Sequence, residues 1–152
     1  MYSITIQKAT DTAFPKPAAL RKWAKAALKT EIAKAEITIR IVGTDEMTTL
    51  NTTYRKKSGT TNVLSFPFSL PAEIDIDLPL GDIVICADVV NREAAEQDKQ
   101  NEAHWAHMVI HGVFHLLGYD HENDNEATIM EAKEIKVLTS LGFANPYEMG
   151  EK

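Results

Sequence analysis

The stretch that decides the fold is "NEAHWAHMVIHGVFHLLGYDH", residues 101–121. Residues 101–117 are apolar almost all round the helical circumference, which predicts a buried central helix. Asn101 is of the residue type that caps helix N-termini, and Gly118 follows the last apolar residue, where a left-handed C-cap would end the helix. The rest of the fold is therefore expected to pack around this helix.

Three histidines in this stretch have the spacing of a metal site. His111 and His115 are four residues apart, so both imidazoles project from one face of the helix and can reach a single ion. Gly118 lets the chain turn sharply, which allows His121 to swing back as a third ligand. This spacing, H-x-x-x-H-x-x-G-x-x-H, is the one with which metzincin peptidases hold zinc. Ordinary core histidines are the alternative, but buried imidazoles would then need other hydrogen-bond partners.

Zinc is the expected ion, one per chain, because a set of imidazole ligands suits it; nickel, copper and iron are the alternatives. Three protein ligands leave a fourth position for water, which is typical of a catalytic site. His104 and His107 continue the histidine stripe toward the helix N-terminus. We expect them at the surface or around the metal ligands, because His104 lies about 10 Å from His111 along the helix axis.

The residue after the first histidine argues against a peptidase. Metzincins carry a glutamate there as general base, whereas this chain has Gly112. Phosphodiester cleavage depends less on such a base, since a metal hydroxide or an RNA 2′-hydroxyl can be the nucleophile, but it requires a cation for the phosphate. The run "YRKK", residues 54–57, supplies Arg55, Lys56 and Lys57, although a solvated basic turn is an equal interpretation.

The segments around the central helix predict an α+β fold. Alternating apolar residues predict strands at 2–7, 36–42 and 62–68, the last at a sheet edge because of Pro67, and an apolar run predicts a buried strand at 81–87. Helical spacing predicts helices at 18–33, 45–55, 88–97 and 125–142. We therefore expect one metal-dependent domain over 1–152, with a four-stranded mixed sheet packed against helices. The acidic, proline-interrupted stretch 69–82 is expected to be a loop.

Composition narrows the class of protein. The net charge of −6, from 16 Lys and Arg against 22 Asp and Glu, argues against a protein that coats nucleic acid by bulk electrostatics. A protein of net negative charge with one basic cluster, at 54–57, is consistent with an enzyme that binds a phosphate group of its substrate. Cys86 is the only cysteine, so an internal disulfide is excluded. With no readable signal peptide and no apolar run of membrane-spanning length, we expect a cytoplasmic protein.

Three segments, "NTTYRKKSGTTNVLSFPF", "LGDIVI" and "HGVFHLLGYDHENDNEATIMEAKE", together resemble the YbeY family of bacterial endoribonucleases over about residues 35–147. The resemblance implies zinc on His111, His115 and His121, and it places the family's functionally important arginine at Arg55. It also implies single-strand-specific RNA cleavage in the maturation of small-subunit ribosomal RNA, and a role in ribosome quality control. The implied partners are ribosomal RNA and the ribosome, with ribosomal proteins or assembly GTPases.

The leading hypothesis is therefore a metal-dependent endoribonuclease with Arg55 as the catalytic cation and Lys56 and Lys57 as substrate-binding residues. Two alternatives stay open at this point. One is a zinc peptidase or amidohydrolase, which Gly112 disfavours; the other is a non-catalytic ribosome-assembly factor with a structural metal.

Overall fold

A mixed β-sheet forms the base of the computed structural model, which describes residues 2–68, 79–120 and 122–147. Strands β1 (Tyr2–Ala9), β2 (Ala35–Val42) and β4 (Pro79–Cys86) run parallel, and β3 (Val63–Pro67) pairs antiparallel with β4. The described strands form one four-stranded sheet in the order β1-β2-β4-β3. The predicted mixed sheet is confirmed, and β3 lies at its edge, where Pro67 does not interrupt an inner ladder.

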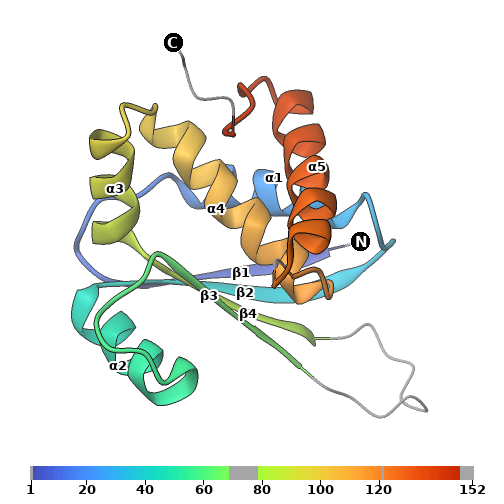
Figure 1. The fold of residues 1–152 in the computed structure, drawn as a ribbon. Helices are drawn as coiled ribbons and strands as arrows, with labels where there is room; N and C mark the ends of the chain where they lie inside the picture. Colours follow the sequence, from blue (N-terminus) through green and yellow to red (C-terminus); the bar gives the residue numbers. More distant parts are fainter. Residues whose placement is uncertain (1, 69–78, 121, 148–152) are drawn as a thin grey trace.

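The helices are divided unequally between the two faces of the sheet (Figure 1). Helices α1 (Pro17–Leu28), α4 (Asn101–Leu116) and α5 (Asp124–Ser140) cover one face, and α3 (Ala87–Glu96) packs beside α4. Helix α2 (Thr44–Arg55) lies on the opposite face. The α+β fold class is confirmed. Helix α1 connects the parallel strands β1 and β2, and α2 lies on the connection from β2 to β3, whereas α3, α4 and α5 follow β4.

Helix α4 is the buried central helix that the sequence predicts. Trp105, Val109, Ile110, Val113 and Phe114 are all inaccessible to solvent. They pack in the main hydrophobic core with isoleucines of the sheet, among them Ile37, Ile39, Ile83 and Ile85. A helix that buries side chains on nearly all sides is held rigidly by its neighbours, so it is a firm base for a ligand site.

The two ends of α4 differ in how well they were predicted. Gly118 has a φ of 103°, so it occupies the positive-φ region as expected. The prediction of Asn101 as N-cap is wrong, because Gln100 holds that position and has no side-chain capping bond. The Asn101 amide instead donates to Asn91 Oδ1 at 2.9 Å, the same oxygen that accepts from Trp105 Nε1. This tertiary contact between α3 and α4 replaces the local cap.

At Gly112, α4 lies close against the sheet. A Cβ at this position would lie 2.8 Å from Cγ2 of Ile83 and 3.4 Å from Oγ of Ser65. Ser65 Oγ donates a hydrogen bond of 3.0 Å to the Gly112 carbonyl. The contact ties the middle of α4 to the edge strand β3, so the histidines on either side of Gly112 have fixed positions relative to that edge.

The opposite face of the sheet carries a smaller core under α2. It contains Val42, Met47, Leu64, Val84, Cys86 and Val89. Cys86 is fully buried, as expected for a small apolar side chain in a strand. Among the described residues, no helix has the length and apolar character needed to cross a bilayer.

Candidate metal centre

His111 and His115 lie together on one face of α4. Their ring centroids are 4.6 Å apart and the ring planes cross at 81°. The 17% exposed His111 and the partly buried His115 are reachable from solvent. The third predicted ligand, His121, lies outside the described residues, so its role stays a prediction.

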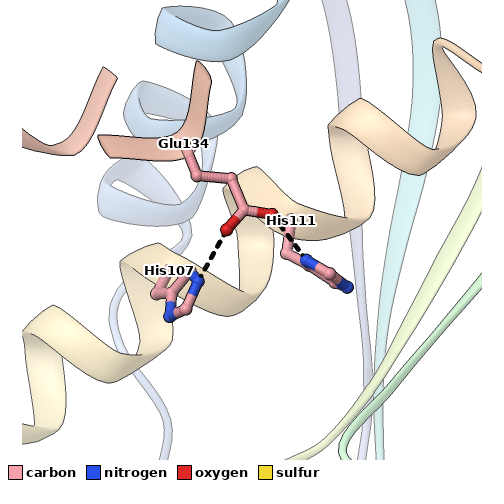
Figure 2. Close-up of side chains that lie close together, drawn as sticks. All are labelled: His107, His111 and Glu134. Atoms are coloured by element: carbon pink, nitrogen blue, oxygen red, sulfur yellow. Dashed lines mark hydrogen bonds and ion pairs between the residues drawn. The ribbon is translucent and has the colours of Figure 1, made fainter. Parts of the chain in front are cut away.

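A buried carboxylate from α5 joins this group (Figure 2). Glu134 is completely inaccessible to solvent. Its Oε2 accepts a hydrogen bond of 2.6 Å from His111 Nδ1, and its Oε1 accepts one of 2.9 Å from His107 Nε2. The hydroxyl of Tyr147 also donates to Oε1 of Glu134 and lies 3.0 Å from His107 Nε2. Glu134 therefore bridges two histidines that are one turn apart on α4.

The protonation states of this group follow from its surroundings. Burial by itself raises the pKa of Glu134, but the hydrogen bonds from His107 and His111 outweigh it and lower the pKa to about 2. Burial and the Glu134 charge raise the pKa of Tyr147, so its hydroxyl keeps the proton that it donates. Because an ionised carboxylate only accepts, the proton of His111 sits on Nδ1 and that of His107 on Nε2. In this tautomer, Nε2 is the ring nitrogen of His111 that carries a lone pair and could bind a metal.

His107, His111 and Glu134 could hold a metal ion. One ligand atom from each lies within 4.8 Å of the others, and imidazole with carboxylate is a donor set that zinc accepts. In a second possible metal site, Glu134 is not a ligand but accepts a hydrogen bond from a histidine ligand. Histidines that bind a metal through one ring nitrogen usually donate the other N–H to a carboxylate. In that arrangement Glu134 orients His111, and the ion lies on the Nε2 side with His115.

Of the two positions expected for His104 and His107, at the surface or around the metal ligands, the surface position is wrong. Their exposed fractions are 4% and 7%. His104 Nε2 is 2.9 Å from Oε1 of Glu93, and burial lowers the pKa of His104 while Glu93 opposes the shift. His107 contacts the carboxylate that holds His111, so it belongs to the surroundings of the predicted ligands.

Glu134 and Tyr147 were missed by sequence reasoning. A signal for Glu134 does exist: it shares one stripe of α5 with Met130, Val137 and Leu138, all of them buried. An acidic residue on the apolar face of a helix indicates a buried partner. Tyr147 follows α5 in an irregular segment, and its spacing carries no comparable signal.

The basic cluster stands apart from the histidines. Arg55 is the last residue of α2, and Lys56, with a φ of 57°, is its C-cap. Arg55, Lys56 and Lys57 are all exposed. Arg55 ends α2, which lies on the opposite face of the sheet from α4 (Figure 1). The role of Arg55 stays a prediction.

Comparison with known proteins shows the family. The family model described as "Endoribonuclease YbeY" matches residues 4–142. The chain belongs to the YbeY family. A protein of Methylococcus capsulatus named "Endoribonuclease YbeY" is 58% identical over 97% of this chain and 96% of its own length. One of Pseudomonas putida with the same name is 55% identical over 97% and 94%. The solution structure of TM1509 from Thermotoga maritima is similar to this chain, with a TM-score of 0.61 and 26% identity over the whole of both chains.

Family membership confirms the resemblance that the three sequence segments suggested. It also argues against the peptidase alternative, which the histidine spacing suggested and Gly112 already disfavoured. The relatives are named endoribonucleases, and the chain covers nearly the whole length of each.

Proposed function

We propose that this member of the YbeY family is a metal-dependent endoribonuclease that cleaves single-stranded RNA during maturation of small-subunit ribosomal RNA and in ribosome quality control. The names of its relatives support the activity. The observation that carries the metal dependence is the pair His111 and His115, with His111 held by the buried, ionised Glu134.

The residues present fit a zinc ion. His111, His115 and His121 would hold it, and Glu134 keeps the proton of His111 on Nδ1 so that Nε2 faces the ion. When bound, zinc supplies a Lewis acid that polarises a phosphoryl oxygen. His107 and Tyr147 hold Glu134 in place through its other oxygen. The chain's own contribution is thus a pre-oriented ligand set on a rigid helix.

Arg55 is proposed to grip a phosphate of the RNA, assisted by Lys56 and Lys57. All three are exposed, and the planar guanidinium of Arg55 can donate two parallel hydrogen bonds to one phosphate. They follow one another at the end of α2, which lies on the opposite face of the sheet from α4. An RNA strand that contacts both the basic residues and the histidines would do so at different nucleotides.

The packing of Gly112 disfavours a peptidase. A metzincin would need glutamate at this position, but even a single Cβ there would lie 2.8 Å from Ile83 Cγ2. The helix is too close to the sheet for a carboxylate side chain to be accommodated. Ribosomal RNA, the ribosome and its assembly proteins are the proposed partners, and the cytoplasm is the proposed compartment.

The test is RNA cleavage together with metal analysis. Wild type, His115→Ala and Arg55→Ala are compared on a single-stranded RNA, with Ile129→Ala, at an exposed site on α5, as the matched control. We expect about one zinc per chain in wild type and Arg55→Ala, loss of zinc in His115→Ala, and loss of cleavage in both site variants. If the site variants cleave as well as wild type, the activity belongs to a contaminant. A metal-loaded protein that never cleaves would favour the assembly factor with a structural metal.

A further inference from the structure

Tyr54 on α2 is an aromatic side chain that the fold leaves exposed. It is 62% exposed, more than any other large hydrophobic residue in the described part of the chain. Its ring stands edge-on to the ring of Phe66 on β3, with centroids 5.4 Å apart and planes at 76°. Phe68, the residue after β3, is 47% exposed. Phe66 is partly buried against the smaller core under α2. Tyr54 and Phe66 thus form a small aromatic platform beside the edge of the sheet, with Tyr54 as its exposed member.

Positive charge surrounds this platform although the protein as a whole is acidic. Arg55, Lys56 and Lys57 follow Tyr54 directly, are exposed, and take part in none of the ion pairs between described residues. The whole chain has a net charge of −6. Aromatic faces next to unneutralised cations are the combination that binds single-stranded nucleic acid, because bases stack on the rings while the cations track the phosphates.

The platform is one strand away from the metal centre. Successive residues of a strand point to opposite faces of the sheet, so the neighbours Ser65 and Phe66 of β3 face opposite sides. Ser65 donates to the Gly112 carbonyl beside His111, whereas Phe66 contacts Tyr54 on the other face. Because β3 is the edge strand, no other strand within residues 2–68, 79–120 and 122–147 pairs with its outer side. A flexible RNA strand could pass over that edge from the platform to the metal centre.

We propose that Tyr54 and Phe66 form a base-stacking platform for single-stranded RNA, with Arg55, Lys56 and Lys57 on the adjoining phosphates. This assignment rests on the proposed function, since it names where the substrate of the same enzyme is held. Duplex RNA fits poorly, because its base faces are already stacked.

Binding of a labelled, 2′-O-methylated single-stranded oligonucleotide tests the platform, since such an RNA binds without being cleaved through its 2′-hydroxyl. Fluorescence anisotropy would compare wild type with Tyr54→Ala, Tyr54→Phe and Ile129→Ala. Loss of one base stack corresponds to a dissociation constant about 5- to 150-fold higher for Tyr54→Ala. Tyr54→Phe, which keeps the ring, and Ile129→Ala, at a 47% exposed site on α5, should bind like wild type. In cleavage assays, Tyr54→Ala should raise KM and leave kcat and zinc content unchanged.

The outcomes separate the platform from the proposed function. If Tyr54→Ala binds RNA as tightly as wild type, the platform is overturned, and the exposed ring belongs to a protein contact. If wild type fails to bind the oligonucleotide, the platform is overturned as well. If wild type binds it in a Tyr54-dependent way but cleaves no unmodified RNA, the platform stands and the nuclease assignment fails.

Discussion

Replacing Glu134 with glutamine should weaken zinc binding by about 10- to 100-fold without abolishing it. Glutamine has nearly the same shape as glutamate but offers one carbonyl oxygen in place of two acceptors. Glu134 now accepts from His111 at 2.6 Å and from His107 at 2.9 Å. In the variant one of these ring N–H groups meets an amide N–H, so that ring must change its tautomer or turn away.

The magnitude follows from the hydrogen bond that is lost. A hydrogen bond to a charged group contributes about 1.5–3 kcal/mol, which corresponds to about 10- to 150-fold in an equilibrium constant. Loss of a carboxylate that only orients a ligand should weaken zinc binding by a factor in this range, whereas loss of a direct ligand should abolish zinc binding. His107→Ala and His115→Ala are the matched comparison. If the ion lies on Nε2 of His111 beside His115, only His115→Ala should lose it.

Competition with a chromophoric chelator gives the zinc dissociation constant, and urea unfolding of the zinc-free variants checks that each one folds. Unchanged affinity in Glu134→Gln would refute the orienting role. Retention of zinc by His115→Ala together with its loss from His107→Ala and Glu134→Gln would refute the arrangement itself. The ion would then sit on the cluster of His107, His111 and Glu134.

Three further predictions concern stability and catalysis. The folded-state pKa of Glu134, about 2, lies below its ordinary 4.5, so this carboxylate stabilises the fold above pH 4.5 and loses the contribution as pH falls toward 2. In urea unfolding of the zinc-free protein, the free energy of unfolding should fall by a value on the order of 3 kcal/mol over this pH range. The same free energy should depend less on pH in Glu134→Gln. Gly112→Ala should lower the free energy of unfolding by about 1–3 kcal/mol because its Cβ meets Ile83, and an unchanged urea midpoint would contradict that packing argument. Arg55→Ala should slow single-turnover RNA cleavage by about 10- to 150-fold with zinc content intact, and Arg55→Lys should recover part of the rate; equal rates in all three would exclude the phosphate grip.

Periodicity in the sequence determined the elements and the central role of α4. The apolar character of residues 101–117 on every side required burial, and all of the large apolar residues of α4 are buried or nearly so. The spacing of His111 and His115 required that they share a face, because helical geometry alone sets that relation. Pro67 indicated the edge position of β3 for an equally local reason, the missing N–H.

The tertiary structure decided which distant segments meet. Glu134 reaches His111 across 23 positions of sequence only because α5 packs along α4, and Tyr147 reaches Glu134 only because the chain folds back after α5. The position of α2, which carries Arg55, on the opposite face of the sheet from α4 likewise depends on tertiary packing. Local backbone geometry sets which side chains share a face. The partner that each face meets depends on how helices pack against a sheet whose strand order, β1-β2-β4-β3, is set by long-range pairing.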